Sequence, residues 1–519
     1  MKKIVIDPIT RIEGHQKIEI TVDDGVVKDA RSSGMLFRGI ELILQGRDPR
    51  DANRITQRIC GVCPTAHSMA SALCLDHAFG IADRIPDNGR IMRNLILGSN
   101  YLQSHILHFY HLAALDYVDV TSVADYEGTD PDLTAVKDFI ERGELGPFVP
   151  RYEGDYRLSK EQNRAAVAHY LQALRVRRKT HELLSIFGGK APHNCSIVPG
   201  GVTERPTVDK MTSFLWRVNE IRDFIDNVYI ADIVMVAAVY SDHFEVGKGC
   251  GNYLSYGVFD LEATPSDLGK KKRFIKPGIT DTELKLGTVD PSKITEQLKH
   301  SWYDDSFTNR HPSDGETSPR YPKSAAYSWI KSPRYDGKPY EVGPLARTLV
   351  SYAQGDPAVK EMVDGVLGEL KAGPDVLFSV LGRHAARALE TKLVADAMAE
   401  WVLQLKPGEP VFQEYDMPEE GAGVGMSGAP RGALGHWIRV KDGVISNYQA
   451  VVPTTWNASP RDDSDTPGPM EQAIIGTNVR DPENPFEVVR IVRSFDPCLA
   501  CSVHLVTPKR RSIRKVTLL

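Results

Sequence analysis

Apolar residues recur along this chain with two different periods. Near the N-terminus they alternate with polar residues in Lys17-Ile-Glu-Ile-Thr-Val22, a turn follows at Asp23-Asp-Gly25, and two more apolar residues come next. This alternation predicts a β-hairpin. Further along, apolar residues recur at helical spacing over residues 91–118, 161–187, 208–240, 357–370 and 381–405. The pattern predicts a mainly helical α+β fold with long central helices and small sheets at the periphery.

Two stretches show neither period. Residues 245–345 are polar and rich in Gly, Pro, Lys and Asp, a composition typical of loops with short strands over the surface. In residues 421–468, Gly and Pro recur among short apolar groups, and we interpret this stretch as irregular backbone lining a site. No internal repeat and no low-complexity linker divides the chain. A single large domain is therefore predicted.

Composition excludes several classes of protein. The 519 residues are 41% hydrophobic and 25% charged, as in a soluble globular protein with a sizeable core. The net charge of −5 gives no basic surface, so no nucleic-acid partner is expected. No apolar run reaches the roughly 20 residues that a bilayer span requires. The N-terminus lacks the apolar stretch of an export signal, so an exported partner would have to carry the protein out of the cytoplasm.

The candidate chemistry lies in seven cysteines. Four of them form two Cys-x-x-Cys pairs, Cys60/Cys63 and Cys498/Cys501, which are more than 430 residues apart. An odd count without regular spacing is unlike a secreted disulfide scaffold. By themselves the pairs leave open a structural zinc site, a redox-active metal site and dithiol chemistry. The remaining cysteines lack the spacing of cluster ligands, and we expect them to be buried small hydrophobes: Cys74, Cys195 and Cys250.

The residues around the pairs decide among these alternatives. Arg58-Ile-Cys-Gly-Val-Cys-Pro-Thr-Ala-His67 and Asp496-Pro-Cys-Leu-Ala-Cys-Ser-Val-His504 resemble the two signature motifs of the large, catalytic subunit of nickel–iron hydrogenases of the uptake type. The resemblance covers nearly the whole chain. Supporting matches follow in the family's order: Thr10-Arg-Ile-Glu-Gly-His15, Phe37-Arg-Gly-Ile-Glu41, Gly46-Arg-Asp-Pro49, His108-Phe-Tyr-His-Leu112, Tyr340-Glu-Val-Gly-Pro-Leu-Ala-Arg347, Ala429-Pro-Arg-Gly-Ala-Leu-Gly-His436 and Val451-Val-Pro-Thr-Thr-Trp-Asn457.

The resemblance implies a nickel–iron centre built from both ends of the chain. Cys60 and Cys498 would bind nickel terminally, and Cys63 and Cys501 would bridge nickel to iron. The iron would also carry carbon monoxide and cyanide ligands. Thiolates are soft donors that suit a redox-active late metal, so the donor set agrees with this implication. The two Cys-x-x-Cys motifs are therefore expected to meet at a buried metal site.

Two short segments are expected to surround this centre. Arg431 would place a fixed cation above the open coordination position, where hydrogen is split. For an arginine in a Gly/Pro loop the ordinary alternative is a salt bridge, and only the motif match reverses this preference. Thr454 would donate to a cyanide nitrogen, and Pro430, Val452 and Pro453 would supply a dry, rigid wall.

Glu13 resembles the family's proton-transfer glutamate, which would accept a proton from a nickel thiolate, in this chain Cys498. A carboxylate can do so when burial raises its pKa toward that of the donor. The alternative is a solvated surface carboxylate. His67 is expected to orient the cofactor pocket by hydrogen bonding. Five other histidines are expected to serve packing or hydrogen bonding around the core: His15, His105, His108, His111 and His193.

A second cation is also implied. Glu41 and His504 resemble the pair that holds magnesium near the C-terminus, and the backbone carbonyl of Ala450 matches the third protein ligand. Oxygen ligands suit Mg²⁺, whereas the imidazole leaves Fe²⁺ open. 

Two departures from the family's pattern matter. Many members have an aspartate before the histidine that matches His105, and this chain has Ser104, so one charge of the shell over the centre is missing. Residues 505–519 follow His504. In this family a maturation endopeptidase removes such a tail after nickel insertion, so the mature domain is expected to be residues 1–504.

The function implied is reversible heterolytic cleavage of H₂ to protons and electrons, run mainly as uptake. The chain has no cysteines left for an iron–sulfur cluster, so electrons would leave through an iron–sulfur small subunit in an obligate heterodimer, with a dimer of heterodimers as a larger assembly. A membrane cytochrome or a quinone-linked carrier would accept the electrons on the periplasmic or outer face. The alternative is a cytoplasmic hydrogenase module coupled to NAD(P) or a deazaflavin carrier.

Overall fold

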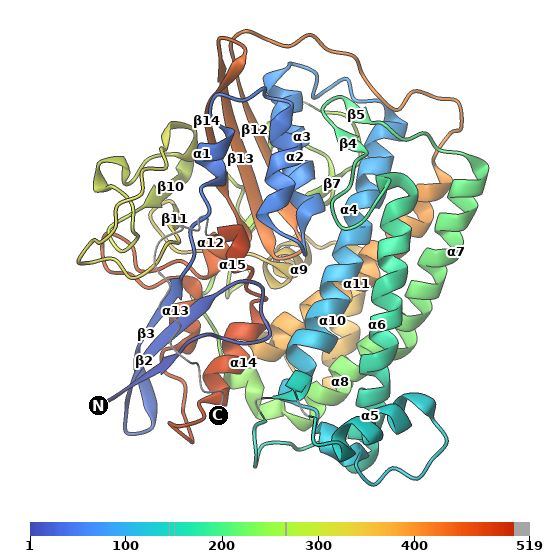
Figure 1. The fold of residues 1–519 in the computed structure, drawn as a ribbon, viewed down its shortest axis with the longest axis vertical. Helices are drawn as coiled ribbons and strands as arrows, with labels where there is room; N and C mark the ends of the chain where they lie inside the picture. The colour runs from blue at the N-terminus through green and yellow to red at the C-terminus, as the bar shows by residue number, and fades with distance from the viewer. Residues whose placement is uncertain (145, 150, 265–266, 503–519) are drawn as a thin grey trace.

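The computed structural model describes residues 1–144, 146–149, 151–264 and 267–502. The fold is mainly helical with small antiparallel sheets (Figure 1), as predicted. Long helices lie side by side in its centre, where α4 packs against α6 and α11, and α7 packs against α6 and α11. Their bounds are α4 (Asp87–Leu107), α6 (Lys160–Gly188), α7 (Val208–Phe224), α8 (Ile230–Val239), α10 (Pro357–Leu370) and α11 (Val380–Leu403).

The ends of the longest helix show why local sequence could predict it. Ser159 caps the N-terminus of α6 by accepting a hydrogen bond from the Gln162 backbone, and the Gln162 side chain accepts one from the Ser159 backbone in return. Such a capping box satisfies two N–H groups that a helix start otherwise leaves unpaired. The helix ends before Gly189, whose φ of 80° is favoured by glycine.

Two of the predicted helices contain π-helical turns. The predicted helix 91–118 consists of α4, the π-helical η2 (His108–Ala113) and the 3₁₀ turn η3 (Ala114–Asp116). The predicted helix 208–240 is α7 and α8 joined by the π-helical η6 (Ile225–Tyr229). A single wide turn hardly changes the apolar spacing, so the sequence pattern does not distinguish it from a continuous α-helix.

The predicted N-terminal hairpin is present and belongs to a three-stranded antiparallel sheet of β1 (Lys2–Ile6), β2 (Gln16–Asp23) and β3 (Val26–Gly34). Buried and half-buried residues alternate along β2, as its sequence predicts. Helix α13 (Pro469–Ile474) packs against β3, so a C-terminal segment covers this N-terminal sheet.

Residues 421–468 differ from the prediction of irregular backbone, which is wrong for most of the stretch. They form the antiparallel sheet of β12 (Gly421–Ala429), β13 (Gly432–Lys441) and β14 (Val444–Val451). The sheet packs against α3 (Pro64–Ala78). A Cβ atom at Gly425 would lie 2.0 Å from the Ala70 carbonyl oxygen of that helix. The glycines therefore let the strand approach the helix closely, and do not break the strand.

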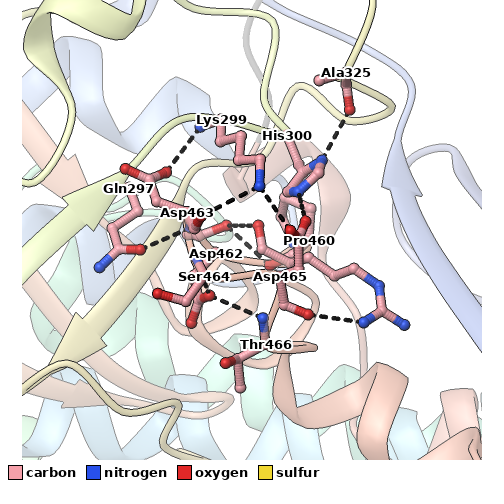
Figure 2. Close-up of polar contacts among 12 residues, drawn as sticks. Gln297, Lys299, His300, Ala325, Pro460, Asp462, Asp463, Ser464, Asp465 and Thr466 are labelled. Atoms are coloured by element: carbon pink, nitrogen blue, oxygen red, sulfur yellow. Dashed lines mark hydrogen bonds and ion pairs between the residues drawn. The ribbon is translucent and has the colours of Figure 1, made fainter.

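The polar stretch 245–345 forms short strands joined by loops, as predicted. Its strands pair as β6 with β9, β7 with β8, and β10 with β11. Figure 2 shows how it is fastened to the loop 460–466: the Asp465 carboxylate accepts hydrogen bonds from Lys299 Nζ and His300 Nε2, each over 2.7 Å. The strand bounds are β6 (Asn252–Ser255), β7 (Val258–Asp260), β8 (Arg273–Ile275), β9 (Gly278–Asp281), β10 (Ile294–Gln297) and β11 (Ser332–Tyr335).

The remaining elements are short. Among the residues that the structure describes, no helix combines the length and apolar character that crossing a membrane requires. The other helices are α1 (Ile40–Leu44), α2 (Asp51–Thr56), α5 (Pro131–Glu141), α9 (Pro344–Ala353), α12 (Pro453–Asn457), α14 (Phe486–Ser494) and α15 (Leu499–Ser502), and the other strands are β4 (Ile197–Val198) and β5 (Gly201–Val202).

The N-terminal and C-terminal segments meet inside the molecule, as predicted. Glu13 and Cys498 form an isolated parallel β-bridge. The Leu499 N–H donates to the Glu13 carbonyl over 2.7 Å, and the Glu13 N–H donates to the Pro497 carbonyl over 3.4 Å. This backbone pairing brings the two Cys-x-x-Cys segments to one place.

Candidate metal centre

Three cysteine side chains lie together where the chain ends meet. Cys60 follows the 3₁₀ helix η1 (Gln57–Ile59), Cys63 caps the N-terminus of α3, and Cys498 lies just before α15. The Sγ atoms of Cys60 and Cys498 are 3.2 Å apart, and all three sulfur atoms lie within 4.8 Å of one another. All three side chains are buried. The Cys501 side chain lies outside the described residues, and its part in the cluster stays a prediction.

The surroundings of these sulfur atoms fit a metal ion. The backbone N–H groups of Val62 and Cys63 donate to Cys60 Sγ over 3.2 and 3.3 Å. Such bonds stabilise a thiolate. Burial and mutual repulsion disfavour several thiolates at once, unless a cation lies between them. A soft metal ion would offset both effects, so the donor set fits the nickel–iron centre that the motifs imply.

Glu13 is the carboxyl group that contacts this cluster. Its Oε2 accepts hydrogen bonds from Cys498 Sγ over 3.2 Å and from the Ala500 N–H over 2.9 Å. Gly14 permits this approach, since its φ is +83° and a Cβ atom there would lie 2.8 Å from the Ala500 nitrogen. Burial and the negative charge of Cys60 raise the pKa of Glu13. The carboxyl group is therefore suited to accept a proton from a sulfur atom.

Arg431 is buried beside the cluster and makes an ion pair, which was the ordinary alternative for this residue. Its Nη2 donates to Asp496 Oδ1 over 2.9 Å, and its Nε donates to the Asp496 carbonyl over 3.0 Å. Its Nη1 donates to Ser104 Oγ over 3.2 Å. Ser104 therefore supplies a neutral acceptor to the guanidinium. The ion pair and the predicted role are compatible, because the pair fixes the guanidinium next to the thiols.

One of the two predicted wall segments contacts the backbone of Cys498. The Cys498 N–H donates to Thr454 Oγ1 over 3.0 Å, so the hydroxyl oxygen acts as an acceptor here and its proton can point to another acceptor. Pro430, Val452 and Pro453 are all buried. Their apolar side chains are consistent with a dry wall, and their assigned roles stay predictions.

His67 lies one helical turn after Cys63 and heads a buried row of polar rings. Its Nδ1 is 3.2 Å from His436 Nε2, and His436 Nδ1 is 2.8 Å from the Tyr448 hydroxyl. Burial lowers the pKa of His67 to about 4, so the ring is neutral near pH 7. This row can fix the orientation of His67. Sequence reasoning gave no role to His436 or Tyr448, although His436 ends one of the matched motifs.

A second group of buried polar residues surrounds Glu41. Glu41 Oε1 accepts a hydrogen bond from the Ala450 N–H over 2.9 Å, and Oε2 accepts one from the Thr317 hydroxyl. Lys331 Nζ lies 3.1 Å from Glu296 Oε2. Two carboxylates therefore share a buried region with one ammonium group, a balance that favours an added cation. Glu41 and the backbone of Ala450 lie together, but through the Ala450 N–H. The carbonyl of Ala450 as a cation ligand stays a prediction, and His504 lies outside the described residues.

Comparison with known proteins decides the family. A family model described as nickel-dependent hydrogenase matches residues 38–504, and a model described as HoxL-like matches residues 3–33. The chain belongs to the nickel-dependent hydrogenase family. It is a hydrogenase large subunit, an oxidoreductase that oxidises H₂, and the family implies a nickel–iron centre for the thiol cluster and a small subunit as its partner.

The similarity to known hydrogenase subunits covers nearly the whole chain. It is 44% identical over 518 residues to the periplasmic [NiFeSe] hydrogenase large subunit of Desulfomicrobium baculatum, covering 97% of this chain and 95% of the relative. It is 38% identical over 580 residues to the uptake hydrogenase large subunit of Rhizobium leguminosarum bv. viciae, covering 99% and 97%. The as-isolated oxidised Ni-Fe-Se hydrogenase from D. vulgaris Hildenborough is similar in structure, with a TM-score of 0.86 at 45% identity, covering 97% of this chain and 100% of that chain. A cytoplasmic module coupled to NAD(P) or a deazaflavin is not favoured.

A buried network of charged residues holds the segment around Pro430. Arg347 donates to the Ala429 and Pro430 carbonyls over 2.9 and 3.0 Å, and Glu390 binds both Arg347 and His105. This buried network positions the Pro430 segment, and sequence reasoning missed it because its members are far apart in the chain.

Cys195 is exposed, so its prediction as a buried hydrophobe is wrong.

Proposed function

We propose that this hydrogenase cleaves H₂ heterolytically at a nickel–iron centre held by Cys60, Cys63, Cys498 and Cys501. The observation that supports it is the buried group of three sulfur atoms within 4.8 Å, contributed by both ends of the chain. Cys60 and Cys498 would hold nickel, Cys63 and Cys501 would hold nickel together with iron, and the iron would carry CO and CN ligands. When bound, this centre supplies the redox chemistry that separates H₂ into protons and electrons.

The protein residues handle the proton. Cys498 Sγ takes up a proton and passes it to Glu13 Oε2, with which it forms a 3.2 Å hydrogen bond. Burial places the two groups in a low-dielectric region where a neutral carboxyl group is favoured, so the transfer does not create an isolated charge. Arg431, fixed by Asp496, supplies positive charge beside the reacting atoms.

The remaining residues around the centre keep the pocket in its orientation and exclude water from it. Thr454 holds the Cys498 backbone, and its hydroxyl proton would be available to a cyanide ligand of the iron. Pro430, Val452 and Pro453 provide the apolar wall, and His67 keeps the pocket oriented through its contact with His436. Exclusion of water strengthens each electrostatic contact inside the site.

A second cation, Mg²⁺ or Fe²⁺, is bound by Glu41, His504 and the backbone carbonyl of Ala450. The buried carboxylates of Glu41 and Glu296 support it. His504 becomes the C-terminus after an endopeptidase removes residues 505–519, so the mature protein is one domain of residues 1–504. Cleavage after metal insertion would explain why a ligand lies directly before the tail.

The subunit works in an obligate heterodimer with an iron–sulfur small subunit, and a dimer of heterodimers is the larger assembly. Electrons leave through that subunit to a membrane cytochrome or a quinone-linked acceptor. The enzyme acts in association with the membrane on its periplasmic or outer face, and an exported small subunit carries the large subunit there. The periplasmic relative supports this location.

Metal analysis of the mature heterodimer tests the proposal. We expect nickel at about one per large subunit, with iron in the same subunit, together with H₂-dependent reduction of an artificial dye. Infrared spectra should show CO and CN stretching bands, and mass spectrometry should place the C-terminus at His504. Zinc as the sole metal, without H₂ oxidation, would refute the proposed centre.

A further inference from the structure

The loop between the two N-terminal cysteines is held from helix α4 by two side-chain amides. Asn100 Nδ2 donates to the Val62 carbonyl over 3.0 Å, and Gln103 Nε2 donates to the same oxygen over 2.6 Å. Both amide side chains are 1% exposed. They lie three residues apart on α4, so they emerge from the same face of the helix. One carbonyl oxygen therefore receives both amides, which occupies both of its lone pairs.

Chemistry fixes the orientation of both amide groups. A carbonyl oxygen can only accept hydrogen bonds, so each amide must present its NH₂ group to Val62. An amide turned the other way would place two oxygen acceptors against each other at hydrogen-bond distance. The two side chains of Asn100 and Gln103 therefore act as donors to the loop, whichever amide atom is taken as nitrogen.

The Val62 carbonyl belongs to the peptide group that also carries the Cys63 N–H. That N–H donates to Cys60 Sγ over 3.3 Å. A peptide group is planar and delocalised, so hydrogen bonds to its oxygen draw electron density from its nitrogen and make its N–H a stronger donor. The Val62 N–H also donates to Cys60 Sγ, but it belongs to the preceding peptide group. The two amides of α4 are thus connected to the Cys60 sulfur through a single peptide group.

Cys60 is the member of the thiol cluster that receives this effect. Its side chain is buried, and its Sγ is 3.2 Å from Cys498 Sγ. In the proposed function this sulfur atom would hold nickel. Hydrogen bonds to a thiolate withdraw electron density from it, and such bonds help to set the reduction potential of a thiolate-bound metal. A stronger Cys63 N–H donor would therefore stabilise the more reduced state of the centre.

We propose that Asn100 and Gln103 are positioning residues that tune the electron density of the nickel–iron centre through the peptide group between Val62 and Cys63. The proposal rests on the proposed function, because it requires a redox-active metal at Cys60. It gives a role to two residues that lie outside all of the matched motifs. Helix α4 also supplies Ser104, whose Oγ accepts a hydrogen bond from the buried Arg431. This helix therefore acts on the centre both through the cysteine loop and through the arginine.

The test uses Asn100→Leu and Gln103→Leu, singly and together, in the metal-loaded heterodimer. Leucine cannot donate to the Val62 carbonyl, so the Cys63 N–H becomes a weaker donor and the Cys60 sulfur keeps more electron density. We expect the infrared CO band to move to lower frequency and the midpoint potential of nickel to become more negative. In the double variant the one-electron equilibrium constant should change about tenfold, which corresponds to about 59 mV. Each single variant should shift both quantities in the same direction by a smaller amount.

Asn94→Leu is the matched control. Asn94 lies on the same helix and is 1% exposed, like Asn100, and its Nδ2 donates to a backbone carbonyl, that of Asp260, over 2.9 Å. Loss of this bond should lower the melting temperature about as much as Asn100→Leu does, because each variant removes one buried amide donor. The CO band and the nickel potential of Asn94→Leu should stay at the positions of the unmodified enzyme. A difference between the two variants therefore reports tuning of the centre and not the loss of a buried hydrogen bond.

Unchanged band positions and potentials in the metal-loaded double variant would overturn the proposal, and so would equal shifts in Asn94→Leu. If the double variant takes up no nickel, Gln103→Met decides, because it keeps the Asn100 bond and a side chain of similar length. A CO band at the unmodified position in Gln103→Met would then overturn the proposal. The unmodified enzyme tests the proposed function separately, because it must itself contain nickel and show the CO band. Its bands without any shift in the variants would count against the role of the two amides alone.

Discussion

Glu13 is half-buried and Glu471 is fully buried, and both have a raised pKa, but they lie among different neighbours. Glu13 accepts a hydrogen bond from a cysteine sulfur atom, Cys498 Sγ, and its pKa is raised by burial and by Cys60. Glu471, on α13, accepts hydrogen bonds from the Ser32 N–H, the Tyr327 hydroxyl and the Gly468 N–H, and burial raises its pKa to about 7. A raised pKa therefore does not identify a catalytic acid. What identifies a catalytic carboxyl is a neighbouring group that can pass a proton to it.

The largest loss of activity should come from replacing Cys498, whose sulfur atom contacts Glu13. Cys498→Ser replaces a soft thiolate by a hard hydroxyl, so we expect nickel content and H₂ oxidation to fall to background. Cys195→Ser, at an exposed cysteine outside the cluster, should retain both. Metal analysis and H₂ uptake on the two purified variants measure this, and a metal-loaded, active Cys498→Ser enzyme would contradict the assigned ligand.

The next effect separates the two glutamates directly. Glu13→Gln keeps the shape and the acceptor for the Ala500 N–H but cannot take up a proton, so we expect H₂ oxidation to fall at least about 100-fold with nickel retained. Glu471→Gln should leave H₂ oxidation unchanged. If both variants lost activity equally, or if neither did, the distinction between the two sites would fail.

A larger residue at Gly425 should show how much the stability of the fold depends on the close packing of β12 against α3. Gly425→Ala would place a Cβ atom 2.0 Å from the Ala70 carbonyl and 2.5 Å from the Cys74 nitrogen of α3, the helix whose N-terminus is capped by Cys63. We expect a loss of about 3 kcal/mol in the free energy of unfolding, measured by denaturant titration. Gly365→Ala on α10, where no atom lies within 4 Å of the added Cβ, should instead be stabilising by about 0.5–1 kcal/mol.

An effect of at most similar size concerns the pH dependence of stability at Glu471. Its pKa is about 7 in the folded chain and near 4.5 when unfolded, so between these values the folded state holds a proton that the unfolded state has lost. The free energy of unfolding therefore falls as the pH rises from about 4.5 to 7, by up to about 3 kcal/mol. Denaturation midpoints across this range should show the fall, and Glu471→Gln should flatten it. An unchanged slope in that variant would refute the assignment.

Local pattern predicted the elements better than the contacts. The helix 357–370 matches α10 residue for residue, because its apolar spacing, its Asp356 cap and its first-turn proline act within a few residues. The sheet β12–β14 was missed, because its glycines serve close packing against α3, which lies more than 300 residues earlier. The spacing of apolar residues, for a strand or for a helix, carries no information about a neighbour so far away in the sequence.

The candidate site shows the same limit. The motifs predicted Cys60, Cys63, Cys498 and Glu13 as neighbours, and the structure places them in contact. Glu296 and Lys331, which lie near Glu41, were not predicted, because they come from the polar stretch 245–345 and no spacing links them to the motifs. The π-helical turn that carries His111 was not predicted either, because one wide turn preserves the apolar pattern.

The pairing of Glu13 with Cys498 has a consequence for synthesis of the chain. Proteins are made from the N-terminus, so the segment around Glu13 leaves the ribosome well before its partner, which follows 485 residues later. At about 5–20 residues per second, the interval is of the order of half a minute to two minutes. Throughout it, the edge of the polypeptide that will receive Leu499 is exposed to solvent or to a chaperone. Parts of the chain that are made early and late thus complete the thiol cluster together, and a chain that stops before Cys498 lacks one of its three described sulfur atoms.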